Sequence, residues 1–126
     1  MKKGFLILFM LIASLPSACS SASAAAPTPT PDPLVVRGRQ VFNARCATCH
    51  ALVPGTVIIG PSLFGVATRA AKRVEGMSAE EYIQRSVLRP GEYVVEGFKN
   101  VMISNFSMEM TGEDLDALVA FLMTLK

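Results

Sequence analysis

The alternation of apolar and polar positions predicts helices that are separated by long irregular stretches. After Asp32 and Pro33, small and apolar residues recur at helical spacing at Val35, Gly38, Val41 and Phe42. Asp32 is suited to the N-cap, where its side chain can accept a backbone N–H, and Pro33 to the first helical position. We therefore expect a helix of about 12 residues that ends at the first of two closely spaced cysteines.

Two further helices are predicted by their starting signals. Ser78 followed by Glu81 has the spacing of a capping box, and Pro90 ends that segment. Thr111 and Asp114 repeat the spacing, and the apolar face that follows consists of Leu115, Leu118, Val119 and Leu122. Almost nothing has the alternation of a strand, so the pattern predicts an all-α fold.

The stretches between these helices, residues 51–75 and 91–110, are unusually long. Irregular loops of this length are uncommon in a compact domain unless they bind something. Three short helices alone would also provide little apolar core for a domain of this size. We therefore expect the loops to wrap around a bound group that supplies the apolar centre.

The first 33 residues differ in composition from the rest. Lys2 and Lys3 precede the apolar run GFLILFMLIASL and then small residues, which is the pattern of a secretory signal. The run is shorter than the roughly 20 apolar residues of a membrane span. Residues 20–33 are Ser, Ala, Thr and Pro with one charge, which favours an extended tether. The predicted division is a signal peptide (1–18), a lipidated cysteine with its tether (19–33) and one domain (34–126).

Cys19 follows the signal in the segment LPSACSS and resembles the lipid-modified cysteine of bacterial lipoproteins. Leu15 lies four residues before it, where the usual pattern has three, and Pro16 takes that place. The alternative is cleavage after Ala24 or Ala26, which would release an unanchored protein. We expect acylation of Cys19 and hence an exported protein, in the periplasm or at the outer face of the cytoplasmic membrane, held there by a lipid anchor.

The candidate chemistry lies in the segment Cys46-Ala47-Thr48-Cys49-His50. The spacing C-x-x-C-H is that of c-type haem attachment, in which both thiols form thioethers with the haem and the histidine binds its iron. A closed zinc site would need four ligands, and the only other Cys or His in the chain is Cys19. A thioredoxin-like pair would need a βαβ context, which is not visible. The motif predicts one covalent haem c.

The match extends beyond this motif. Residues 34–126 resemble class I (monohaem) cytochrome c in four segments: GRQVFNARCATCH, GPSLFGV, YIQRSVLRPGEYV, and VMISNF with MTGEDLDALVAFLMTL. The resemblance implies a small all-α cytochrome c fold, with three or more short helices and long loops around one haem. It also implies that Pro61 accepts a hydrogen bond from His50 Nδ1, and that Gly38 and Phe42 pack against Phe121.

The second axial ligand follows from the resemblance as well. No second histidine is present, so bis-histidine ligation within the chain is excluded, and the long loop contains Met102, Met108 and Met110. The resemblance assigns the ligand to Met102. The family often has Met-Pro here, whereas this chain has Met102-Ile103, and loss of the proline removes a restraint on the loop.

A haem with His50 and Met102 as ligands has no open position, so we expect electron transfer and no small-molecule substrate. The first hypothesis is a single-electron carrier in a respiratory or photosynthetic chain. Alternatives are a cytochrome subunit fixed in a membrane-bound quinol-oxidising complex, and a haem enzyme or gas sensor with a labile methionine. The expected partners are redox proteins or a membrane complex, and no nucleic acid.

Charge is unevenly distributed along the domain. Residues 33–74 contain six basic residues and no acidic one, whereas residues 75–126 contain nine acidic and four basic residues. We expect some of the basic residues to flank the haem edge and to meet an acidic partner surface. Candidate contacts to the haem propionates are Arg89, Tyr93 and Lys99.

Overall fold

The computed structural model describes residues 30–126, which form five helices: α1 (Pro33–Arg45), α2 (Val66–Ala70), α3 (Ala79–Leu88), α4 (Phe106–Glu109) and α5 (Gly112–Met123). Within these residues the only β-type pairing is one isolated bridge between His50 and Val57. The all-α expectation is confirmed. The predicted signal peptide and Cys19 lie outside the described residues. Among residues 30–126, no helix has the length and apolar character that a membrane crossing requires.

The three helices predicted from their starting signals are present. Asp32 caps α1 by accepting the Leu34 N–H at 2.8 Å, and Pro33 is its first residue. Ser78 Oγ accepts the Glu81 N–H at 3.1 Å at the start of α3. Each predicted helix therefore begins where a polar side chain satisfies one of its unpaired N–H groups.

The reciprocal half of the capping box at α3 differs from the expectation. The Glu81 carboxylate does not return to the cap but accepts a hydrogen bond from Arg85 at 2.7 Å, one turn further along the helix. At α5, Thr111 Oγ1 accepts the Asp114 N–H at 3.1 Å, and the Asp114 carboxylate pairs with Arg37 of α1 at 2.9 Å. Stronger guanidinium partners thus take both carboxylates, and the second pair joins α1 to α5.

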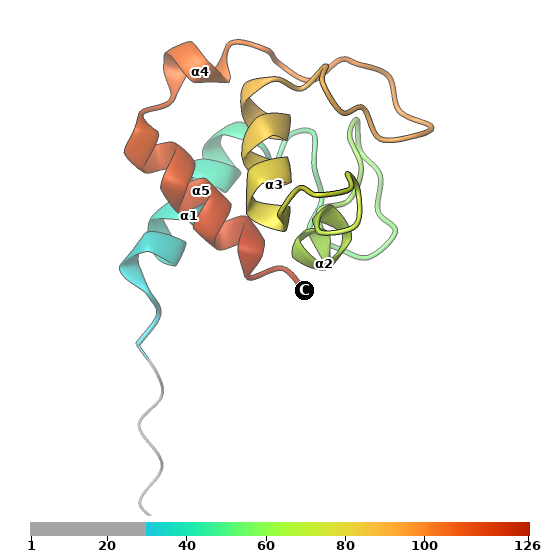
Figure 1. The fold of residues 1–126 in the computed structure, drawn as a ribbon. Helices are drawn as coiled ribbons and strands as arrows, with labels where there is room; N and C mark the ends of the chain where they lie inside the picture. Colours follow the sequence, from blue (N-terminus) through green and yellow to red (C-terminus); the bar gives the residue numbers. More distant parts are fainter. Residues whose placement is uncertain (1–29) are drawn as a thin grey trace, which may run out of the picture.

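Helices α1 and α5 cross at close range (Figure 1). A Cβ atom on Gly38 would lie 1.9 Å from the carbonyl oxygen of Ala117, so only glycine permits this approach. Beside it, the rings of Phe42 and Phe121 lie 5.6 Å apart between centroids and tilt by 54°. The Arg39 guanidinium lies 4.8 Å from the Phe121 ring centroid, in cation–π range. The expected packing of Gly38 and Phe42 against Phe121 is confirmed.

The sequence pattern did not predict α2 and α4. They have five and four residues, and neither begins with a side-chain cap hydrogen bond. Gly65, with φ of 65°, turns the chain into α2. Both are supported by tertiary contacts, since α2 contacts α3 and α5, and α4 contacts α3 and buries Phe106 in the core cluster. Such short helices depend on their surroundings more than on their own sequence.

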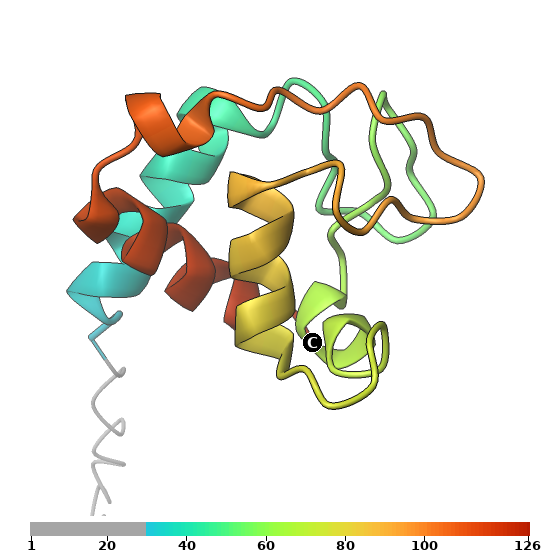
Figure 2. The same cartoon turned by 45° about the horizontal axis from the view of Figure 1, so that its top comes forward.

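The core lies between α5 and α3, and the two long loops extend from the other side of α3 (Figure 2). Leu118 and Phe121 of α5 are completely buried, and Ile83 and Val87 of α3 pack into the same cluster. The compact half of the molecule is therefore the α1–α5 crossing with one face of α3. The other half is built from loops 51–65 and 89–105.

Candidate functional site

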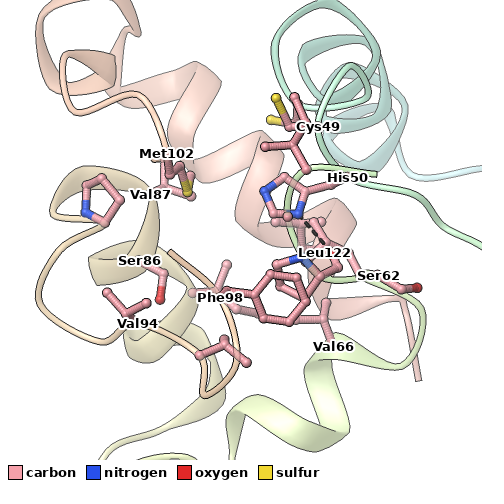
Figure 3. A pocket seen from close by; sticks show the side chains of 18 of the residues that line it. Cys49, His50, Ser62, Val66, Ser86, Val87, Val94, Phe98, Met102 and Leu122 are labelled. Atoms are coloured by element: carbon pink, nitrogen blue, oxygen red, sulfur yellow. Dashed lines mark hydrogen bonds between the residues drawn. The ribbon is translucent and has the colours of Figure 1, made fainter. Parts of the chain in front are cut away.

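The loops and the core helices enclose a cavity of about 470 Å³. This volume lies within the roughly 300–1,000 Å³ that is usual for cofactor and small-molecule sites. Much of its wall is apolar and comes from Val66, Ile83, Val87, Leu118 and Leu122. The site residues expected from the sequence all line this one cavity: Cys46, Cys49, His50, Pro61 and Met102. Figure 3 shows the cavity from close by.

The cysteine motif is set in place by the end of α1. The Cys46 N–H donates to the Phe42 carbonyl at 2.8 Å, which continues the helix by one bond. The N–H groups of Cys49 and His50 both donate to the Cys46 carbonyl, at 3.0 and 2.9 Å. This tight turn brings both cysteines and the imidazole to one side of the cavity.

Burial raises the pKa of the Cys46 thiol to about 11, with Arg45 lowering it and Cys49 raising it by smaller amounts. The free thiol is therefore neutral at pH 7. A thioether at this position is neutral as well, so covalent attachment of a haem leaves no charge on this sulfur in a poorly solvated place. The surroundings of Cys46 therefore accommodate the neutral sulfur of a thioether.

The imidazole of His50 is held by the loop that follows it. His50 Nδ1 lies 2.8 Å from the Pro61 carbonyl oxygen. When Nδ1 carries the proton and donates it there, Nε2 is free to bind a metal. The Gly60 N–H donates to the Cys49 carbonyl at 2.9 Å, and a Cβ atom on Gly60 would lie 2.3 Å from His50 Cε1. The sequence analysis missed Gly60, whose bare backbone leaves room for the ring.

Met102 lies across the cavity from His50 (Figure 3). It belongs to the 89–105 loop and is partly buried against the core cluster. The other two methionines considered from the sequence, Met108 and Met110, do not line the cavity, and Met108 is 83% exposed. The assignment of Met102 as an iron ligand stays a prediction. Its position beside the cavity is the position that this role requires.

The charged and polar lining of the cavity fits a haem. All the charged side chains on the wall are cationic, namely Arg45, Arg69, Arg73 and Lys99. Haem carries two propionate groups, so a wall with cations and no carboxylate is complementary to it. Ser86 Oγ is buried, lines the cavity and has no hydrogen-bond partner, so it offers one more donor (Figure 3). No three His, Cys, Asp or Glu side chains of residues 30–126 are grouped to hold a bare metal ion.

The basic residues of segment 33–74 do not form one free surface. Arg37 pairs with Asp114 at 2.9 Å, and Arg45 pairs with Glu109 at 3.2 Å. These two pairs therefore neutralise part of the charge difference between residues 33–74 and residues 75–126. Such exposed pairs each stabilise the fold by about 1 kcal/mol or less.

Arg69 fixes the loop after the cysteine motif. Its guanidinium donates to the Ser62 carbonyl at 2.8 Å and to the Phe64 carbonyl.

Among the propionate candidates, Tyr93 and Lys99 line the cavity. Arg89 does not, and it pairs with Glu92 at 3.6 Å. The sequence analysis missed Arg69, Arg73 and Ser86 as cavity residues, because no short motif marks them.

A family model described as cytochrome c matches residues 35–126 of this chain. The match includes α2 to α5 and all of α1 except its first two residues. It also contains the whole cavity lining described above. Within such a domain, the motif of Cys46, Cys49 and His50 binds one haem through covalent bonds. The chain therefore belongs to the cytochrome c family, and its domain is an all-helical haem c domain for electron transfer.

Proposed function

We propose that this cytochrome c is a single-electron carrier in which His50 and Met102 would be the protein ligands of the haem iron. The observation that supports it is that His50 and Met102 lie on facing sides of one cavity. Cys46 and Cys49 line the same cavity. The haem supplies a one-electron couple, and a methionine ligand raises its potential relative to bis-histidine ligation.

The residues of the chain then have distinct roles. His50 binds through Nε2, while the Pro61 carbonyl accepts its Nδ1 proton and orients the ring. Met102 would be the second ligand, which would leave the iron no open position for a substrate. The apolar wall excludes water and lowers the local dielectric, which limits the reorganisation that accompanies each electron. Nothing in this arrangement requires a bound small molecule besides the haem.

We also propose that the carrier works outside the cytoplasm in a respiratory or photosynthetic chain and is tethered to the membrane. The proposal rests on the sequence of residues 1–33, which divides into signal peptide (1–18), Cys19 and tether, before the domain begins at residue 34. A tether keeps the domain at high effective concentration near membrane-bound partners.

The anchor gives a prediction on the mature N-terminus. Intact-mass measurement of protein extracted with detergent is expected to show a chain that begins at Cys19 and carries two or three acyl groups. The Cys19→Ala variant serves as the control and is expected to lack the added mass and to leave the membrane fraction. An unmodified wild-type chain that begins after Ala24 or Ala26 would contradict the lipid anchor.

The function itself is tested by a potentiometric titration of the haem spectrum. We expect a single one-electron transition and an unchanged spectrum when carbon monoxide is added to the reduced protein. Rapid binding of carbon monoxide would favour the enzyme or gas-sensor alternative. Size exclusion in detergent separates the remaining alternatives, because a carrier elutes at small mass and a fixed subunit elutes with its complex.

A further inference from the structure

The segment that carries Met102 has few restraints of its own. Among residues 30–126, no backbone–backbone hydrogen bond involves Met102, Ile103 or Ser104, and Ile103 is 53% exposed. Ile103 also stands where a proline would fix the backbone, so that restraint is missing as well. The position of Met102 therefore depends on what holds the chain on either side of this segment.

Asn105 is the first residue after this segment that is fixed by its contacts. Its Nδ2 group donates to the Glu109 carboxylate, and its Oδ1 atom is buried. The Asn105 carbonyl accepts the Met108 N–H at 2.9 Å, in the first turn of α4. Asn105 thus joins the end of the Met102 segment to α4 through both its side chain and its backbone.

Glu109, the last residue of α4, is held in turn by Arg45, the last residue of α1. One guanidinium nitrogen of Arg45 donates to the Glu109 carboxylate and the other to the Glu109 carbonyl, both at 3.2 Å. Arg45 directly precedes Cys46, and in Figure 2 α4 lies next to this end of α1. We call Arg45, Glu109 and Asn105 the Arg45 bridge.

We propose that the Arg45 bridge is a positioning network that keeps Met102 in the haem cavity and limits its detachment from the iron. The proposal rests on the proposed role of Met102 as a ligand. Cys46 ties the cofactor to the end of α1, and the bridge ties the Met102 segment to the same helix end. Only Ile103 and Ser104 separate Met102 from this fixed point. A short free segment has little conformational entropy to gain by moving away.

The expected size of the effect is modest. The side chains of Arg45 and Glu109 are 36% and 49% exposed, and an exposed pair of this kind changes an equilibrium constant about fivefold or less. Phe106 is buried in the core cluster and supports α4 independently of the bridge. Loss of the bridge should therefore loosen the Met102 segment without unfolding α4.

The test compares Glu109→Gln with Asp114→Asn in the full-length holoprotein. Each carboxylate pairs with an arginine of α1, and neither residue lines the haem cavity. Both variants remove one negative charge and one such pair, but Asp114 has no contact with the Met102 segment through Asn105. The oxidised proteins are titrated with imidazole, and the near-infrared sulfur-to-iron band reports the loss of methionine ligation.

The apparent affinity for imidazole rises with the fraction of molecules in which Met102 is detached. We expect Glu109→Gln to bind imidazole about fivefold more tightly than the wild type, and Asp114→Asn to stay within about twofold of it. Asn105→Ala should shift the affinity in the same direction as Glu109→Gln. In an Arg45→Gln background, Glu109→Gln should add no further change, because the bridge is already broken.

Guanidinium denaturation separates this role from a general loss of stability, since Glu109→Gln and Asp114→Asn should lose similar amounts. Equal imidazole affinities in these two variants would overturn the proposal. So would a wild-type affinity in Asn105→Ala, or a full effect of Glu109→Gln in the Arg45→Gln background. The near-infrared band is checked in the wild type first. Its absence there would contradict the axial-ligand proposal, whereas a failure of the bridge alone leaves that band intact.

Discussion

Replacing Met102 with alanine is expected to lower the midpoint potential by on the order of a hundred millivolts, within the roughly 0.8 V that axial ligands span. The thioether stabilises the reduced iron, and alanine cannot replace it. The vacated side also becomes open to added ligands. Carbon monoxide or imidazole should therefore bind Met102→Ala at concentrations that leave the wild type unchanged. Spectroelectrochemistry and ligand titration measure the two effects.

Met108→Ala is the matched control for this variant. Met108 lies in the same part of the chain, is 83% exposed and does not line the haem cavity. Its loss should leave both the potential and the ligand affinity at the wild-type values. A wild-type potential in Met102→Ala, together with a lowered potential in Met108→Ala or Met110→Ala, would show that another methionine is the ligand.

Substitution of Gly38 with alanine should destabilise the fold by about 3 kcal/mol, at the upper end of the usual cost of overpacking. The added methyl group would lie 1.9 Å from the Ala117 carbonyl oxygen and 2.7 Å from Phe121 Cβ. Neither atom can move without moving α5, so the two helices must separate. The helix propensity that alanine gains over glycine, about 1 kcal/mol, offsets only part of this cost. Guanidinium denaturation of the holoprotein, followed by circular dichroism, measures the change.

Gly112→Ala provides the comparison within α5. A Cβ atom on Gly112 would meet no atom within 4 Å, and its φ does not require glycine. We expect this variant to be as stable as the wild type or slightly more stable, since alanine restricts the unfolded chain. Equal stability of Gly38→Ala and Gly112→Ala would show that the α1–α5 crossing can relax, and would contradict the tight contact described here.

The sequence predicted the elements that carry their own local signals. Helices α1, α3 and α5 begin at Asp32, Ser78 and Thr111, where a side-chain oxygen caps the first turn. Helices α2 and α4 have no such cap, and contacts with distant parts of the chain support them. A pattern that is read along the chain cannot detect that kind of stability.

The same difference between local signals and contacts with distant parts of the chain applies to the site. The spacing of Cys46, Cys49 and His50 is a local signal, and it led to the correct cofactor. The role of Gly60 depends on the imidazole that lies beside it, and Arg69, Arg73 and Ser86 line the cavity only because distant segments meet there. Arg37 and Arg45 pair with acids that are more than sixty residues away, and the charge pattern along the chain did not reveal these pairs. These features arise from folding and leave no motif.

The near-infrared spectrum of the oxidised wild-type protein tests the central claim most directly, since a methionine sulfur bound to ferric haem gives a charge-transfer band there. With His50 and Met102 as the two ligands, the full-length protein at neutral pH should show this band, and Met102→Ala should lose it while Met108→Ala keeps it. Absence of the band from the wild type would mean that no methionine binds the oxidised iron, and would contradict the proposal of a closed His50/Met102 electron carrier.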